Sequence, residues 1–537
     1  MANKNILLIE PGYKNKYPPL GLMKIAQYHG ANGKKDNVKF IKGEDKSAER
    51  IVWDRIYITT LFSFEWNKIS ETIEYASKLV SQQHDKIFVG GIAASLMHEK
   101  FLSQDKWRGI RFIQGLLDKS PAESLQLDDF EEELYSEDLD STPIEDLIPD
   151  YSILGQIEYK YPVHDAYFAY ATRGCVRKCA FCGVPKLEGG MREMPPLSKI
   201  VGGIEKLYGP KKDLILMDNN VVASPRLKEI IDEVVDLGFA KGATMVNPRT
   251  GKKVQRRVDF NQGVDARILA KSEHFMKQLS RVCLSPLRIA FDHVGLIKPY
   301  EQAVRYASAS GLNFLSNYML YNFHDTPNDL FQRMRINVSL NEELGTQIYS
   351  FPMRYQPTDR PDRGHVGEHW NKYYLRSIQI ILQATHGVVS GAPEFFKKAF
   401  GDTEDEFLKI LRMPHDFTFN RDWFEKFGGR AELDEFNTQI NKLYESEVEE
   451  LMNFLASHFP SEYLKESKKI KNNKIRNMIP FYKRLTIEEN RKIWSSQKQI
   501  KNKLNIAMAD DEIVEDAGLD HNPDTEIEEN MRKVIAR

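Results

Sequence analysis

Three of the four cysteines in this 537-residue chain lie close together, in the stretch ATRGCVRKCAFCGVP that begins at Ala171. Cys175, Cys179 and Cys182 have the spacing C-x3-C-x2-C, so one short loop supplies three thiolates. Such a loop can wrap around a cuboidal iron-sulfur cluster, and three ligands leave one iron open for a substrate or cofactor. Basic side chains around the loop favour thiolate over thiol and offset an anionic cluster. These side chains are Arg173, Arg177 and Lys178.

Two other interpretations of the cysteine loop stay open at this point. A tetrahedral zinc site would need a fourth ligand, which a distant histidine or Cys283 would have to supply. The cysteines could also be small buried side chains without a metal.

Composition indicates a soluble globular protein with several domains, because 41% of the residues are hydrophobic and the formal net charge is -2. Four cysteines in so long a chain do not form a disulfide framework, which predicts a reducing, cytoplasmic setting. The first residues, MANKNILLIEPG, contain an apolar run too short for a signal peptide, and no membrane-spanning segment is expected.

Strand-like and helix-like patterns alternate over residues 5–100, which predicts a Rossmann-like domain with a parallel sheet over 1–117. Residues 118–160 are acidic and contain several prolines, so we expect a solvated linker. The alternation resumes over 161–400, where the candidate strands are 166–174, 213–219, 257–263, 287–294, 313–320 and 347–355. This series predicts an open or partial barrel with its active site at the carboxyl ends of the strands.

The C-terminal region, 401–537, is predicted to be mainly helical and charged, and it ends in an acidic tail. Residues 465–503 contain 13 Lys or Arg against three Glu, whereas 504–537 contain ten acidic residues against three basic ones. The basic stretch is a candidate nucleic-acid contact, with Phe481, Tyr482 and Trp494 as stacking platforms. A solvated helical face is the alternative.

The segment CVRKCAFC resembles the CxxxCxxC signature of the radical S-adenosylmethionine (radical SAM) superfamily, including the aromatic Phe181 before the third cysteine. The resemblance implies a partial (β/α)6 barrel and a [4Fe-4S] cluster on Cys175, Cys179 and Cys182, with S-adenosylmethionine bound at the open iron. It further implies an electron donor such as a flavodoxin or ferredoxin.

Both flanks resemble members with an N-terminal cobalamin-binding-type domain, in YPPLGLMKIAQY, VGGIAASL and DLDSTPIEDLIPDYSIL. The DxHxxG phrase whose histidine ligates cobalt in many such domains is missing, since His29, His84 and His98 have other contexts. Cobalamin binding is therefore disfavoured at this point.

Polar residues that follow the second and third predicted strands are candidates for cofactor binding, together with Phe181. After the second strand, where the superfamily holds the methionyl amino group, the candidates are Asp218, Asn219 and Asn220, with helix capping as the alternative. After the third strand they are Asn261, Gln262 and Asp265. Asp292 and His293 follow the fourth strand, and strand alternation allows only one of them to face the barrel interior. Weaker candidates after the fifth strand are Asn322, His324 and Asp325.

The segment after the sixth strand is rich in arginine, histidine and aromatic residues, a mixture that suits an anionic or aromatic substrate. The substrate candidates are Arg354, Tyr355, His365, His369 and Trp370. The leading hypothesis is a radical SAM enzyme that modifies an unidentified substrate by hydrogen abstraction. The alternatives are a cobalamin-dependent radical SAM methyltransferase and a non-catalytic iron-sulfur protein that binds nucleic acid.

Overall fold

The computed structural model describes residues 3–119, 141–248, 250–385, 387 and 389–503. It forms two compact units, one of residues 1–325 and 332–365 and the other of residues 326–331 and 366–537. The mixed α/β class, with parallel sheets and a mainly helical C-terminal part, is confirmed. The domain boundaries that the sequence predicts at 117, 160 and 400 stay predictions. Residues 120–140 of the acidic stretch and the acidic tail lie outside the described residues.

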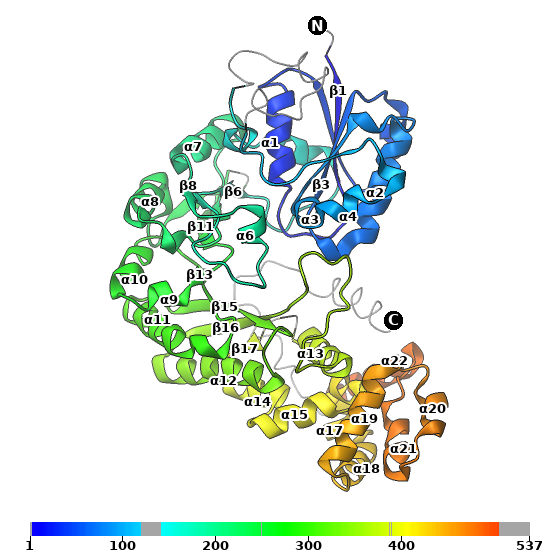
Figure 1. The fold of residues 1–537 in the computed structure, drawn as a ribbon. Coiled ribbons are helices and arrows are strands. Elements are labelled where there is room, and N and C mark those ends of the chain that lie inside the picture. The colour runs from blue at the N-terminus through cyan, green and yellow to red at the C-terminus, as the bar shows by residue number, and fades with distance from the viewer. Residues whose placement is uncertain (1–2, 120–140, 249, 386, 388, 504–537) are drawn as a thin grey trace. The chain divides into compact units, whose positions relative to one another are not determined.

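The first unit begins with a five-stranded parallel sheet in the order β2-β1-β3-β4-β5. Helix α1 lies on one face of this sheet and α2 to α4 lie on the other (Figure 1). The strands are β1 (Asn5–Glu10), β2 (Asn37–Lys42), β3 (Arg55–Thr60), β4 (Ile87–Gly91) and β5 (Arg111–Phe112). The helices are α1 (Leu20–His29), α2 (Trp66–Leu79), α3 (Ile92–Leu96) and α4 (His98–Leu102).

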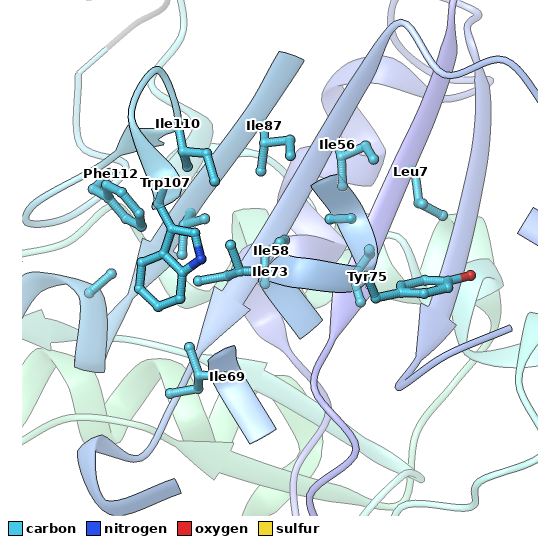
Figure 2. Close-up of a cluster of buried hydrophobic side chains, with 14 of the residues drawn as sticks. Leu7, Ile56, Ile58, Ile69, Ile73, Tyr75, Ile87, Trp107, Ile110 and Phe112 are labelled. Atoms are coloured by element: carbon cyan, nitrogen blue, oxygen red, sulfur yellow. The ribbon is translucent and has the colours of Figure 1, made fainter. Parts of the chain in front are cut away.

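Apolar side chains from the strands and from α2 to α4 form the core on one face of this sheet (Figure 2). Strand β1 is buried from its second residue to its last, as expected for a parallel strand covered on both faces. Helix α2 contributes Ile69, Ile73 and Ala76, whose spacing of three and four residues forms one helix face. Trp107 and Phe112 close one end of the cluster.

The rest of the first unit repeats strand and helix, with helices α7, α8, α10 and α11 along the outer side of the strands (Figure 1). One sheet has the order β12-β9-β6, and a second contains β13-β14-β15-β16, all with parallel neighbours. A parallel bridge from Val258 to Leu284 continues the pairing beyond β12. The main strands are β6 (Ala166–Ala169), β9 (Asp213–Leu216), β12 (Val258–Phe260), β14 (Leu287–Ala290), β15 (Phe314–Tyr321) and β16 (Gln347–Arg354), with the short β13 (Val264–Asp265). The helices are α7 (Leu197–Tyr208), α8 (Leu227–Val234), α9 (Ala266–Leu269), α10 (Glu273–Leu279), α11 (Ile297–Ala309) and α12 (Pro327–Leu344).

The second unit is mainly helical and has its own apolar core. Tyr482 lies in that core with 3% of its surface exposed, and the Phe481 ring packs edge-on against Phe436. Trp494 donates its indole N–H to Asn420. The three aromatic residues of the basic stretch thus make packing contacts, and the buried Tyr482 presents no ring face for a base. The principal helices are α13 (Lys372–Ala384), α14 (Pro393–Phe400), α15 (Glu404–Arg412), α18 (Arg430–Ile440), α19 (Glu445–Ser457), α21 (Asn473–Met478) and α22 (Ile487–Lys503).

Among the helices of the described ranges, none combines the length and the apolar character needed to cross a bilayer.

Candidate functional site

A two-stranded antiparallel pair closes the cysteine loop at its base, just after β6. Strand β7 (Thr172–Arg173) pairs with β8 (Arg192–Glu193), so residues 174–191 form a loop that leaves and returns at one point. Gly174, the first loop residue, has φ of 73°, and a Cβ there would lie 2.2 Å from the carbonyl oxygen of Gly190. Only glycine fits this close approach without moving the backbone. We call residues 172–174 and 190–193 the neck of the loop.

All three loop cysteines are half-buried thiols, and backbone amides point at two of their sulfurs. The Arg177 amide donates to Cys175 Sγ at 3.4 Å, and the Val184 amide donates to Cys182 Sγ at 3.5 Å. Hydrogen bonds of this kind stabilise thiolate ligands and tune iron-sulfur clusters. Burial raises the pKa of Cys179 and of Cys182, so in the absence of a metal both thiols keep their protons at neutral pH. Metal binding deprotonates such thiols, so the three cysteines can supply thiolate ligands and fit a cluster.

A single zinc ion needs four ligand atoms around one point, whereas in a cubane each thiolate binds a separate iron. Within the described part of the chain, no group of three or more histidine, cysteine, aspartate or glutamate side chains is arranged to hold one metal ion. Cys283 would be a fourth ligand in the zinc interpretation. It is buried, and the residue before it, Val282, forms a β-bridge with Ala240.

An ionic network surrounds the second cysteine. Asp265, at the end of β13, accepts from Arg177 Nε at 2.7 Å and from Arg267 Nε at 2.8 Å. Burial acts to raise the pKa of Asp265, but the hydrogen bonds from the two arginines outweigh it and hold this pKa below its usual value. Arg267 also interacts with Cys179, where it opposes the effect of burial. The carboxylate of Asp265 therefore fixes two cations beside the loop.

The second-strand candidates lie where the sequence predicts, immediately after β9, and each already has a protein partner. The Asp218 carboxylate accepts from the amides of Ala171 and Thr172 and from the Thr172 hydroxyl. Burial raises the pKa of Asp218 to about 6 despite these hydrogen bonds. Asn219 Nδ2 donates to Glu188, and Asn220 Oδ1 accepts from the Asp265 amide. These contacts support the chain that leads into the cysteine loop, and cofactor binding by the three residues stays a prediction.

The third-strand candidates differ in exposure. Asn261 is buried, and its Oδ1 accepts a hydrogen bond from the hydroxyl of Tyr17. Gln262 is exposed. Tyr17 belongs to the segment between β1 and α1, so a residue from the first sheet reaches a strand end of the second part of this unit. Sequence reasoning missed Tyr17, because nothing in its local pattern indicates a contact more than two hundred residues away.

Asp292 and His293 both lie just beyond the end of β14, so strand alternation does not apply to them, and they differ in exposure: Asp292 is half-buried and His293 is exposed. Burial raises the pKa of Asp292 to about 6, while Arg333 and Arg267 oppose the shift. Asp292 also acts electrostatically on Cys179, which places its carboxyl on the side of the cysteine loop.

Aromatic rings connect the loop with the strand ends that follow. Phe181 packs edge-on against Phe323 with ring centroids 5.8 Å apart, and Phe323 packs against Tyr355 at 4.6 Å. Asn322, with φ of 69°, donates to the carbonyl oxygens of Tyr355 and His365. Phe323 carried no sequence signal of its own.

Two more candidates follow Asn322 in the loop after β15. His324 is exposed, and Asp325 is buried and paired with Arg333.

The structure brings three of the five substrate candidates together. Arg354 Nη2 donates to the His365 carbonyl at 2.9 Å, and the ring of Tyr355 lies edge-on to that of His365 at 5.1 Å. Burial lowers the pKa of His365, and Arg360 and Arg354 lower it further, which favours the neutral imidazole. His369, which is exposed, and Trp370, which is buried, belong to the second unit.

In the N-terminal sheet, the order β2-β1-β3 places a topological switch point between the carboxyl ends of β1 and β3, where sheets of this kind bind ligands. Tyr13 connects these two strand ends: it follows β1, is 1% exposed, and its hydroxyl accepts from the amide of Leu61, which follows β3, at 3.0 Å. His29 is fully buried between Asp36 and Tyr57, and His84 contacts Arg108 and Gln82, as expected for structural histidines.

No protein-family profile matches the chain, and no curated protein matches it. Several solved structures show a distant likeness, among them the following two. One is a radical S-adenosylmethionine methyltransferase, TsrM, from Kitasatospora setae with cobalamin and a [4Fe-4S] cluster bound. It has 14% identity and a TM-score of 0.42, and the match covers 67% of this chain and 77% of that one. The other is the apo, selenomethionine-labelled cobalamin-dependent S-adenosylmethionine radical enzyme OxsB, with 12% identity, a TM-score of 0.43, and coverage of 96% and 82%. Both solved proteins are radical SAM enzymes.

Proposed function

We propose that this chain is a radical SAM enzyme whose cluster is held by Cys175, Cys179 and Cys182 at the mouth of a partial (β/α)6 barrel. The observation that carries the proposal is the cysteine loop itself. It follows the first of six parallel strands, closes at a glycine-dependent neck, and directs backbone amides at two sulfurs. When bound, the cluster would supply the electron that cleaves S-adenosylmethionine to methionine and a 5'-deoxyadenosyl radical, which takes hydrogen from the substrate.

The chain's own residues divide the remaining tasks. Asp218 and Glu188 fix the backbone before the first cysteine, so that the loop is preorganised. Asp265 holds Arg177 and Arg267 in place next to Cys179, and these cations offset the negative charge of a cluster. Phe181 and Phe323 form an apolar ring pair at the loop. Asn261, Asn219 and Asp292 are polar groups at three neighbouring strand ends that suit the polar parts of S-adenosylmethionine.

The substrate region is proposed to include Arg354, Tyr355 and His365, which lie in one cluster after β16. The Nε of Arg354 is buried without a hydrogen-bond partner in the described structure, which leaves one donor of its guanidinium group for an anionic substrate. An external electron donor such as a flavodoxin or ferredoxin would complete the system.

The decisive experiment is anaerobic reconstitution of the full-length chain with iron and sulfide, followed by reduction with dithionite and addition of S-adenosylmethionine. We expect 5'-deoxyadenosine to form even without substrate. Cys179→Ala should abolish its formation, whereas Cys283→Ala, the matched control outside the loop, should retain it. An unchanged rate in Cys179→Ala would contradict the proposal.

Cobalamin-dependent methyl transfer is the second candidate, because the first sheet has the strand order of a ligand-binding Rossmann-like domain. Tyr13 connects the two strand ends at the usual crevice, so a corrinoid would have to bind elsewhere on the sheet or displace this ring. Protein produced with cobalamin supplied and then purified would show corrinoid absorption if this candidate holds. A spectrum with cluster bands alone would favour hydrogen abstraction without methyl transfer.

A further inference from the structure

The neck of the cysteine loop brings two arginines face to face. Arg173 and Arg192 are register partners in the β7–β8 pair, and like charges directly opposite each other destabilise such a pair. Arg173 is buried, with 7% of its surface exposed, so water screens the repulsion poorly. Carboxylates must therefore compensate the two guanidinium groups.

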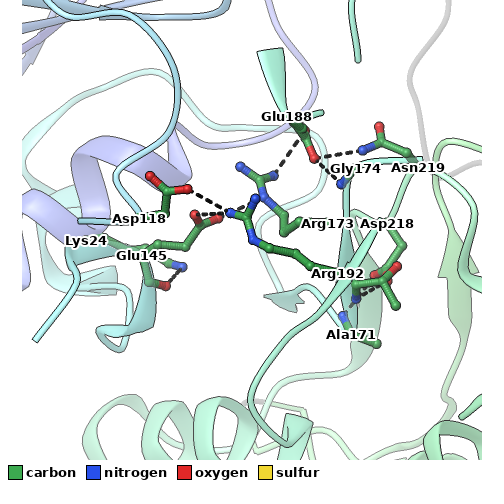
Figure 3. A network of polar contacts seen from close by, with 11 residues as sticks. Lys24, Asp118, Glu145, Ala171, Arg173, Gly174, Glu188, Arg192, Asp218 and Asn219 are labelled. Atoms are coloured by element: carbon green, nitrogen blue, oxygen red, sulfur yellow. Dashed lines mark hydrogen bonds and ion pairs between the residues drawn. The ribbon is translucent and has the colours of Figure 1, made fainter. Parts of the chain in front are cut away.

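Glu145 contacts both arginines (Figure 3). Its Oε1 lies 2.8 Å from Arg173 Nε, and its Oε2 lies 3.6 Å from Arg192 Nη2. Its backbone carbonyl accepts a hydrogen bond from Lys24 Nζ of helix α1. Glu145 lies within the segment 118–160 that the sequence predicts to be a solvated linker, yet only 6% of its surface is exposed. This part of the segment contributes a buried carboxylate to the neck.

Glu188 holds the neck from within the loop. Its Oε1 lies 3.3 Å from Arg173 Nη1. Its Oε2 accepts from the Gly174 amide at 2.8 Å and from Asn219 Nδ2 at 2.9 Å. One side chain therefore fixes the residue before Cys175, the arginine before that, and a candidate cofactor residue at the end of β9 (Figure 3).

The charges of the cluster balance. Lys24, Arg173 and Arg192 face Asp118, Glu145 and Glu188, with Asp118 accepting from Arg192 at 3.1 Å at the exposed end. Burial of an uncompensated charge is costly, so removing either buried carboxylate unbalances the whole set.

We propose that Glu145 and Glu188 are positioning residues that hold the neck closed and thereby keep the three thiols within reach of one cluster. Neither carboxylate touches a cysteine, and both act through Arg173, with Glu188 also acting through Gly174. The identity of the bound group rests on the proposed function, whereas closure of the neck is a property of the chain with or without a cluster.

The test compares Glu145→Gln and Glu188→Gln with a matched control, Glu10→Gln. Glu10 is also buried and paired, at 2.6 Å from Lys42 Nζ, but it lies in the first sheet. Amide hydrogen exchange over residues 172–193 is measured on the full-length chain without cluster. We expect exchange at least about tenfold faster in both neck variants, the effect of losing one buried ion-paired carboxylate, and little change in Glu10→Gln. After reconstitution, iron release to a chelator should accelerate by about the same factor in the neck variants.

A double variant distinguishes opening of the neck from unfolding of the whole chain. Arg173→Met with Glu188→Gln removes one charge of each sign, so the charges of the cluster still balance and Glu145 keeps Arg192 at 3.6 Å. Gln can still accept from the Gly174 amide. Faster exchange at the neck in this folded variant supports the proposal. Wild-type exchange rates in the folded neck variants, or equal acceleration in Glu10→Gln, would overturn it. A wild-type chain that takes up no iron would contradict the proposed function instead, and the exchange rates would still decide the role of the two carboxylates.

Discussion

Replacing Gly174 by alanine tests the geometry of the cysteine loop most sharply, because the chain offers two graded controls. Gly174 has a positive φ, and an added Cβ meets the Gly190 carbonyl oxygen at 2.2 Å. Gly189 also has a positive φ, of 74°, but an added Cβ there meets nothing within 4 Å. Gly190 has neither restriction.

The expected costs follow from these three environments. Alanine at Gly189 carries only the left-handed backbone penalty, about 1–2 kcal/mol, which corresponds to a roughly five- to thirtyfold increase in neck opening. Alanine at Gly174 has the same backbone penalty and also a steric clash, which is relieved only if the backbone of Gly190 moves. Its destabilisation of the neck therefore exceeds about 2 kcal/mol, and neck opening increases by more than about thirtyfold. Alanine at Gly190 should change opening by less than about threefold, because it reduces only the freedom of the unfolded chain.

The assay is native-state amide exchange at β7 and β8, followed by iron and sulfide content after anaerobic reconstitution. We expect the loss of protection to rank Gly174→Ala, then Gly189→Ala, then Gly190→Ala, and the cluster content to fall in the same order. Wild-type protection and a full cluster in Gly174→Ala would refute the loop geometry, as would a larger effect of Gly190→Ala than of Gly174→Ala.

Three further predictions concern buried or half-buried polar residues of the first unit. Burial raises the pKa of Asp218 from 3.8 to about 6, so the folded chain binds this proton more tightly than the unfolded chain and loses stability as the pH rises. In urea unfolding, Asp218 should contribute a fall of roughly 3 kcal/mol between pH 3 and 7, and Asp218→Asn should reduce the pH dependence by that amount, whereas parallel profiles would contradict the assignment. Asp259→Asn should destabilise the chain by about 3–5 kcal/mol in chemical denaturation, because it leaves the buried Arg288 without its bidentate partner, and Asp259→Leu with Arg288→Met should recover most of the loss. Tyr17→Phe should weaken S-adenosylmethionine binding, measured by calorimetry, by about two- to tenfold with the cluster intact, because the hydroxyl that orients Asn261 is lost; unchanged affinity would remove Asn261 from the cofactor site.

Much of the strand pattern could be read from the sequence, because buried parallel strands are short apolar runs. The run NILLIE coincides with β1, and each of the six later candidate segments overlaps a strand of the structure. Strand β2 was missed because its sequence, NVKFIK, alternates apolar residues with lysine and lies at the sheet edge, where burial is incomplete. The helix start at Thr326-Pro327 was also predictable, and Thr326 caps α12 through the Asp329 amide.

The site residues also fall into two groups, those that the sequence indicates and those that only the fold brings together. The cysteine spacing identifies the loop because the three ligands are local in sequence. Glu145, Glu188 and Tyr17 could not be found from the sequence, because an isolated carboxylate or tyrosine has no periodicity and its partner is fixed only by the fold. The acidic character of 118–160 even pointed away from Glu145, since most acidic residues in such a stretch are solvated.

Metal and sulfide analysis of anaerobically purified and reconstituted chain tests the central claim most directly. The account predicts about four iron and four labile sulfide atoms per chain, with reduction giving the spectrum of a [4Fe-4S] cluster, and loss of both elements in Cys175→Ala, Cys179→Ala or Cys182→Ala. Zinc in place of iron, without labile sulfide even after reconstitution, would contradict it.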